Sequence, residues 1–352
     1  MVSVDDPSVF DVAHIRAVEE TNDTSELSLD GDLLLLTSSW EKRCLEITRA
    51  RHGRYSRGAM IGFAEMGESE LRPQHDEALQ AFLAKQTDSV TVFEPMASSD
   101  LQGWRDAIRD FLVDGARAAG RPIDLVVDLT CLPKYFALLV LGFALKAGVA
   151  GRITFFYAGG RYDLTAKDSL SPVQSFTEGD WRSFQVPYLE GDLSADRKVR
   201  IVAAIGFETY QARSFIEAYE AESHELIMPY PGFSPDYEPR GENETKALAT
   251  FLDIEMDKVH RVPAGSAVQS AELALDLFSQ GKPYRDLALC LGTKPQALGL
   301  GLAALCMPHV TVVCRIPSRY AETSTPPSGR SWVYRVEDTS ALPLLFLEPP
   351  QI

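Results

Sequence analysis

The sequence predicts an α/β protein built from two tandem Rossmann-like domains with mainly parallel sheets, related by internal duplication. The first observation behind this prediction is a regular alternation along the chain. Short apolar runs rich in branched residues are followed by longer helical patterns, which indicates a parallel sheet with helices on both faces. The second observation is a strand–loop–helix unit that occurs twice, around Asp128 and again around Thr293. We therefore expect the two halves to repeat one fold.

Matching residues follow one another in the same order along the two halves. Lys134 matches Lys294 at an offset of 160 residues, and Trp181 matches Trp332 at an offset of 151. A slow drift of the offset is expected when a domain is copied and then acquires small insertions. Other matched pairs are Trp40-Glu41 with Phe207-Glu208, Phe82-Leu83 with Phe251-Leu252, and Phe156-Tyr157 with Cys314-Arg315. The alternative is two unrelated α/β domains with similar local patterns.

The duplication divides the chain into three parts. Residues 1–30 are rich in acidic residues and in Ser and Thr, and we expect a partly ordered leader. Residues 31–197 form the first Rossmann-like domain with a connecting segment, and residues 198–352 form the second. Both lie within the range of about 50–250 residues that is usual for a domain.

Strand and helix patterns alternate through the first half. Apolar runs of four to six residues are typical of strands buried on both faces of a parallel sheet. The expected strands are residues 33–36, 59–63, 90–93, 123–127 and 152–157. The expected helices are one from about residue 40, then 76–83, 101–119 and 135–146. Before the first helix, Ser38 and Ser39 predict a turn and N-cap, with Glu41 in the first helical turn.

The second half repeats this scheme. Its expected strands are residues 199–205, 225–228, 259–262, 287–291 and 310–315. Its expected helices are residues 210–222, 244–252 and 267–279, and one that begins at Pro295, a residue well suited to the first helical position. Residues 328–336 match the region around Trp181, and we expect them to add a terminal strand.

Composition and charge limit the function classes. The chain has 352 residues, of which 45% are hydrophobic, so it is long enough for two cores. Its formal net charge of −16 disfavours general binding to nucleic acid or to an anionic membrane, although local cations can still hold a small anion. We find no signal-peptide pattern and no apolar run near the ~20 residues of a membrane span. Five scattered cysteines indicate reduced thiols. These features together predict a cytoplasmic protein.

Several motifs that would signal an enzyme or a cofactor are missing from the sequence. We find no P-loop, no His-Glu-x-x-His, no Cys-x-x-Cys and no Gly-x-Ser-x-Gly elbow, so no metal ligand, cofactor or catalytic residue is assigned. Gly299 and Gly301 fit a loose dinucleotide fingerprint. However, they lie inside an expected helix, where small residues more often allow close packing.

Polar residues cluster where the expected strands end. Ligands bind at the carboxyl ends of the strands in open α/β sheets, because helix N-termini present free N–H groups there. The candidate ligand-binding residues are Ser38, Ser39, Glu41, Asp128, Thr130, Lys134 and Arg161 in the first half, and Gly206, Thr209, Gly292, Thr293, Lys294 and Arg319 in the second. Structural alternatives are helix capping for the hydroxyl residues, a Lys134–Asp128 ion pair, a solvent-directed Lys294, and repeated corners at the two arginines.

The pattern Asp-x-Thr-x-x-x-Lys, from Asp128 to Lys134, resembles the loop of CRISPR-associated Rossmann-fold (CARF) ligand-sensing domains. The turn at Ser38 and Ser39 lies where those domains place their other ligand-contacting loop. Two such domains in one chain are similar to the SAVED arrangement, in which a tandem pair senses a cyclic oligonucleotide made during prokaryotic antiviral defence. The resemblance has departures: Cys131 and Leu132 replace the usual glycines, and the second copy lacks the leading Asp.

Three functions fit the sequence. The first is a sensor or binding subunit that holds a nucleotide-like anion between the halves; since no effector domain is recognised, a protein partner would carry the effector activity. The second is a nucleotide hydrolase or transferase that uses Asp128, Glu41 or Glu208 as acid or base. The third is a scaffold subunit whose contact surface is the Pro- and aromatic-rich segment at residues 229–237. The paired copies of one site favour the binding module over the enzyme.

Overall fold

The computed structural model describes residues 15–64, 70–161, 177–191, 197–207, 209–280, 284–320 and 325–336. Its first sheet has seven strands in the order β1-β15-β8-β7-β3-β5-β6. The strands β3, β5, β6, β7 and β8 are parallel to their neighbours in this set, whereas β15 and β1 are antiparallel. Their bounds are Ile15–Thr21 (β1), Leu33–Thr37 (β3), Arg57–Ile61 (β5), Val90–Val92 (β6), Ile123–Asp128 (β7), Ala150–Gly160 (β8) and Pro327–Val336 (β15).

The second sheet has six strands in the order β12-β11-β10-β13-β14-β9. The first five are parallel, and β9 is antiparallel to β14. Their bounds are Thr177–Gln185 (β9), Lys198–Ala204 (β10), Ser223–Pro229 (β11), Val259–Val262 (β12), Tyr284–Cys290 (β13) and Val310–Tyr320 (β14). A short pair, β2 (Ser28–Leu29) and β4 (Arg51–His52), lies beside the first sheet.

The two sheets have the same strand order when each is counted from its own first parallel strand. In both, the chain runs through the third, second, first, fourth and fifth strands from one edge, and an antiparallel strand follows the fifth. This is a Rossmann-like order, and its repetition confirms the predicted fold class of two duplicated α/β domains.

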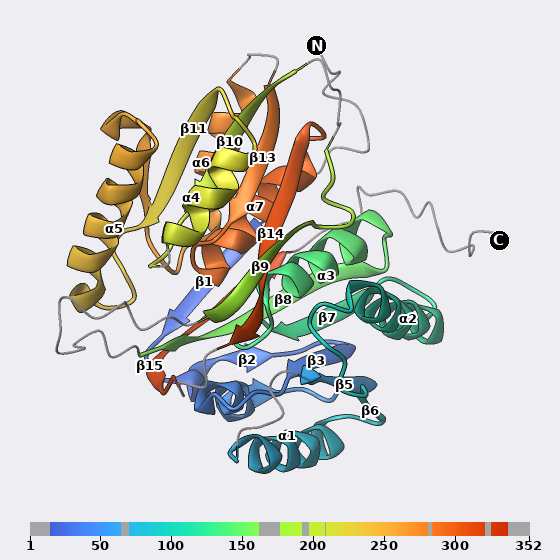
Figure 1. Cartoon of the computed structure of the whole chain (residues 1–352). Coiled ribbons are helices and arrows are strands. Elements are labelled where there is room, and N and C mark those ends of the chain that lie inside the picture. The colour runs from blue at the N-terminus through green and yellow to red at the C-terminus, as the bar shows by residue number, and fades with distance from the viewer. Residues whose placement is uncertain are drawn as a thin grey trace.

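The antiparallel strands are exchanged between the halves. Strand β9 follows β8 in the chain but pairs with β14, whereas β15 follows β14 and pairs with β8 (Figure 1). Trp332 consequently faces Tyr157 of the first sheet, and Trp181 faces Pro317 of the second. A chain division at residue 197 therefore does not divide the sheets, because each sheet is completed by a strand from the other segment. In the predicted leader, β1 adds a further strand to the first sheet, and residues 1–14 lie outside the described residues.

Helices cover both sheets. In the first half they are the 3-10 helix η3 (Lys42–Arg49), α1 (Arg72–Gln86), α2 (Leu101–Ala119) and α3 (Lys134–Lys146). In the second half they are α4 (Thr209–Ala218), α5 (Glu238–Phe251), α6 (Ala267–Ser279) and α7 (Lys294–Cys306). The segment expected as a helix with a serine cap is a 3-10 helix with Glu41 at its N-cap position and no side-chain cap bond. The reason is that the Ser38 hydroxyl donates to Asp76 of α1 instead.

Helices α3 and α7 join the halves through one shared core. Every residue from Tyr135 to Leu145 in α3 is buried, as is every residue from Pro295 to Cys306 in α7, which explains why both are apolar on all sides. A side chain at Gly301 would collide with Leu138 of α3. A side chain at Gly299 would lie 2.5 Å from the carbonyl oxygen of Ala267 in α6. The two glycines therefore allow close helix packing, as expected.

All five cysteines are buried and free of disulfide bonds. Within the described part of the chain, none of the helices has both the length and the apolar character needed to cross a membrane.

Candidate functional site

The loops after β7 and β13 meet where the two halves come together. These are residues 129–133, which lead into α3, and residues 291–293, which lead into α7. The side chain of Lys134, the first residue of α3, donates from Nζ to the carbonyl oxygen of Leu291 at 2.9 Å. Lys294, the first residue of α7, donates from Nζ to the carbonyl oxygen of Thr130. Each lysine thus reaches across to the loop of the other half, which differs from a Lys134–Asp128 ion pair or a solvent-directed Lys294.

A cavity of about 210 Å³ lies beside these two lysines. It is lined by Arg43, Lys134, Tyr157, Gly206, Phe207, Pro229, Gly232, Phe233, Tyr237, Ala264, Leu291, Gly292, Thr293 and Lys294. These residues come from the carboxyl ends of strands, from the loops that follow them and from the first residues of helices. This is the edge of an α/β sheet at which ligands bind.

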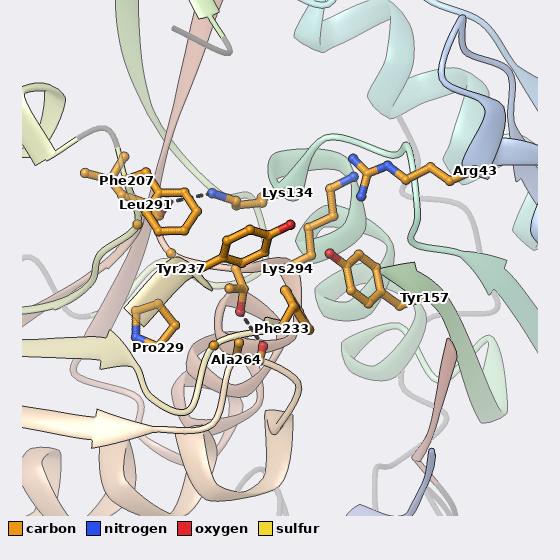
Figure 2. Close-up of a pocket in the computed structure, with 14 residues that line it drawn as sticks. Arg43, Lys134, Tyr157, Phe207, Pro229, Phe233, Tyr237, Ala264, Leu291 and Lys294 are labelled. Carbon is orange, nitrogen blue, oxygen red and sulfur yellow. Dashed lines mark hydrogen bonds between the residues drawn. The ribbon is translucent and has the colours of Figure 1, made fainter. Parts of the chain in front are cut away.

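The cavity lining is cationic in a strongly acidic chain. Arg43, Lys134 and Lys294 contribute three positive charges, and among the described residues that line the cavity none is acidic. The nearest printed carboxylate partner is that of Glu41, which accepts a hydrogen bond from Nε of Arg43 at 2.5 Å. Figure 2 shows the nitrogen ends of Arg43 and Lys294 next to each other. Two adjacent cations repel unless an anion lies between or beside them, so the arrangement favours an anionic ligand.

Four aromatic side chains form the rest of the wall. Tyr157 and Phe233 lie with ring centroids 5.7 Å apart, and Phe207 and Tyr237 meet edge to face, also at 5.7 Å. The hydroxyls of Tyr157 and Tyr237 point toward each other beside Lys294 (Figure 2). Phe207 and Phe233 are only half-buried, so both keep ring surface exposed at the cavity. Aromatic faces of this kind can stack on a planar base.

The environment of Lys294 weakens its proton affinity. Burial is the main cause, and the positive charge of Arg43 adds to it; together they lower the pKa of Lys294 to about 8 from its ordinary value of 10.5. Cys131, Glu41 and Asp128 act in the opposite direction. A bound anion would favour the charged ammonium, so ligand binding and protonation of Lys294 are linked.

Asp128 lies behind the loop rather than in the cavity wall. Its Oδ1 accepts a hydrogen bond from the backbone nitrogen of Thr130 at 2.9 Å, and its Oδ2 has no hydrogen-bond partner in the described residues. Burial raises the pKa of Asp128 to about 6, although Thr130 and the charge of Lys294 lower it. Its carboxylate shapes the electrostatics of the site without contacting the space that a ligand would fill.

Five of the residues predicted from the sequence line the cavity: Lys134, Gly206, Gly292, Thr293 and Lys294. Thr293 also caps α7, because its Oγ1 accepts a hydrogen bond from the nitrogen of Gln296 at 3.3 Å and donates one to the carbonyl oxygen of Ala264 at 2.7 Å. The capping interpretation and the lining interpretation therefore both hold for this residue.

The other predicted residues lie outside the lining. The hydroxyl of Thr130 accepts from the nitrogen of Ala158 at 3.0 Å, and that of Thr209 donates to Glu244 at 2.6 Å. Both hydroxyls are thus used to connect neighbouring segments. The Ser38 and Ser39 side chains are buried and bonded within the first half, Glu41 pairs with Arg43, Arg161 is exposed after β8, and Arg319 pairs through its backbone with Glu178 in β9. Glu208 lies outside the described residues.

Several lining residues were not predicted. Phe233 and Tyr237 belong to the segment at residues 229–237, whose aromatic content suggested a contact surface; in the structure both face the cavity. Phe207 directly follows Gly206, and Tyr157 lies in β8, but apolar neighbours made both look like ordinary core residues. Arg43 carried no local signal, since one arginine in a polar helix is ordinary.

Comparisons with known proteins add no family. No protein-family model and no curated protein matches the chain. Among solved structures, a functionally unknown protein from Pseudomonas aeruginosa PAO1 is 10% identical with a TM-score of 0.24, and covers 82% of this chain and 93% of its own. The cytoplasmic domain of a prokaryotic cation chloride cotransporter is 11% identical with a TM-score of 0.22, and covers 82% of this chain and 96% of its own. At these TM-scores the similarities carry no argument about function.

Proposed function

We propose that this chain is a cytoplasmic sensor or binding subunit that holds a nucleotide-like anion in the cavity between its two halves. The observation that carries the proposal is the composition of the cavity wall. Three cations and four aromatic side chains converge there from both halves of the chain, with no carboxylate among the described lining residues.

Each part of the wall has a role in this proposal. Lys134, Lys294 and Arg43 hold the phosphate through charge-assisted hydrogen bonds. The N-termini of α3 and α7 lie at the same place and add the positive ends of two helix dipoles. The exposed ring surfaces of Phe207 and Phe233 stack on the base. An acidic surface elsewhere keeps the chain from binding nucleic acid in general.

The position of the cavity explains how binding is passed on. Lys134 and Lys294 tie the halves together through carbonyl oxygens, and a phosphate competes for the same ammonium groups. Occupancy therefore shifts the balance between two arrangements of the halves, to the extent that the ligand prefers one of them. A protein partner carries the effector activity. The resemblance to CARF and SAVED sensors supports a role in antiviral defence, with a cyclic oligonucleotide as one member of the ligand class.

One observation favours an enzyme as the second candidate. Asp128 has a raised pKa beside a lysine with a lowered one, and such shifts are frequent at active sites. A hydrolase would need the Asp128 carboxylate to reach the ligand, so it would require a movement of the loop at residues 129–133. Loss of nucleotide turnover in Asp128→Asn would favour the enzyme; unchanged ligand binding without turnover in the wild type favours the sensor.

Calorimetry with a panel of linear and cyclic nucleotides tests the proposal. Lys134→Ala and Lys294→Ala should each weaken binding by about 1–3 kcal/mol, the range for one charge-assisted contact. Salt should weaken it as well. The exposed Lys85 in α1 provides a matched control, and Lys85→Ala should leave the affinity unchanged. Absence of binding to every nucleotide by the wild type would refute both the sensor and the enzyme.

A further inference from the structure

The cavity is not shared equally by the two halves. Only three of its lining residues, Arg43, Lys134 and Tyr157, come from the first half of the chain, and the remaining lining residues lie between Gly206 and Lys294. A ligand with its own two-fold symmetry, bound on the axis that relates the halves, would need equivalent contacts from each. The wall therefore has to be compared with its counterparts in the described part of the first half.

The loops before the two lysines differ in length and chemistry. The β13–α7 loop presents Gly292 and Thr293 to the cavity, whereas the corresponding positions before Lys134 are Leu132 and Pro133. Leu132 and Pro133 are buried, and Pro133 has no backbone N–H to offer an anion. The β7–α3 loop is also two residues longer. The anion-binding backbone of one half is therefore not repeated in the other.

The other matched positions differ too. Gly206 lines the cavity, but its counterpart Ser39 is buried and accepts a hydrogen bond from the nitrogen of Glu41 at 3.2 Å. Tyr157 lines the cavity, whereas its counterpart Arg315 lies over the rings of Trp181 and Phe215, at 5.7 and 5.9 Å from their centroids. These differences build one nucleotide site, not two halves of a symmetric site.

Charge and size narrow the occupant further. The lining side chains carry +3, or +2 when Glu41 on Arg43 is included. A phosphomonoester carries about −1.5 to −2 at pH 7 and balances this charge, whereas a phosphodiester carries a single negative charge. The volume of about 210 Å³ is below the ~300–1,000 Å³ usual for pockets that take drug-sized ligands, which fits one nucleoside unit.

We infer that the occupant is a single nucleoside phosphomonoester rather than a cyclic oligonucleotide, an inference that rests on the proposed function. The dianionic phosphate lies among Lys134, Lys294 and Arg43. The base lies against Phe207 or Phe233, the two half-buried rings of the wall.

The test compares ligands that share a base and differ in the phosphate. Calorimetry is run at pH 7.5 with 5′- and 3′-monophosphates of adenosine, guanosine, cytidine and uridine, their 3′,5′-cyclic monophosphates, the free nucleosides, and symmetric cyclic di-, tri- and tetranucleotides. For at least one base, the monophosphate should bind at least about tenfold more tightly than its cyclic diester, its nucleoside and every cyclic oligonucleotide. Tighter binding of a cyclic diester or a cyclic oligonucleotide would overturn the inference while leaving the proposed function intact. No binding of any probe would overturn both.

Variants show whether the measured site is this cavity. Phe233→Leu should weaken binding of the preferred monophosphate at least about threefold, whereas Lys294→Met should weaken it at least about tenfold. Phe251→Leu is the matched control, because Phe251 lies outside the cavity wall at the end of α5 and is 39% exposed. If the control weakens binding as much as Phe233→Leu, or if neither cavity variant weakens it, the assignment to this cavity is wrong. Near-ultraviolet circular dichroism of each variant verifies that the fold is retained.

Discussion

The charge state of Lys294 makes ligand affinity depend on pH. Its pKa is lowered to about 8, mainly by burial and then by Arg43. A lysine is charged below its pKa, and an anion binds the charged form. Affinity should therefore be at its full value below about pH 8 and should be lost as the pH rises through this value. This direction holds whichever nucleotide is the ligand, since it depends only on the ligand being an anion.

The lowered pKa sets the size of the effect. With a pKa of about 8, Lys294 is charged in about nine-tenths of the molecules at pH 7 and in about one-tenth at pH 9. If only the charged form binds, the affinity falls about tenfold over this interval, which corresponds to about 1.4 kcal/mol. A phosphate loses its second proton near pH ~6, so the ligand contributes little in this range. The two neighbouring groups with resolved shifts have pKa values of about 6 for Asp128 and about 12 for Cys131, both outside the interval.

Calorimetry of the tightest nucleotide at pH 7, 8 and 9, in buffers of equal ionic strength, measures this dependence. Lys294→Arg provides the matched variant, because a guanidinium stays charged up to about pH 12. Its affinity should change less than about twofold between pH 7 and pH 9, even if its absolute value is lower. A wild-type affinity that is constant from pH 7 to pH 9 would refute the reasoning, as would an equal decline in Lys294→Arg.

Three further predictions concern the fold. The folded-state pKa of Asp128 is raised from 3.8 to about 6, so the ionised carboxylate destabilises the folded state, and stability is lost as the pH rises through this interval; Asp128→Asn should raise the free energy of unfolding in urea by up to about 3 kcal/mol at pH 7.5 and by almost nothing at pH 4, and a less stable variant at pH 7.5 would contradict this. Gly301→Val should lower the free energy of unfolding by about 1–3 kcal/mol, because its side chain would meet Leu138, and an unchanged urea midpoint would contradict this packing. Deletion of residues 325–352 removes β15 and leaves β8 of the other segment without its partner, so the cooperative thermal transition of the whole protein should disappear; a truncated chain that keeps the wild-type melting temperature would show that the exchange is not needed for stability.

The amino-acid sequence by itself determined the local units and their repetition. Apolar runs bounded by polar turns are buried on both faces wherever a parallel sheet forms, so the strands at 123–127 and 287–291 could be predicted from composition alone. The lysines at the starts of α3 and α7 could be predicted as site residues for a similar reason. They are charged residues at helix N-termini that follow buried strands, and local sequence shows both features.

Only the tertiary structure decided which strands exchange and which side chains complete the site. An antiparallel strand at residues 327–336 fits either sheet by its alternation, and it pairs with β8 because the two halves pack through α3 and α7. Arg43 and Tyr157 come from the first half but face loops of the second, more than a hundred residues away in the chain. Ser39 and Thr130 have the residue types of a binding site, yet neighbouring backbone groups occupy their hydroxyls. Local sequence specifies what a side chain can bond to, whereas the packing of distant segments specifies which partner is within reach.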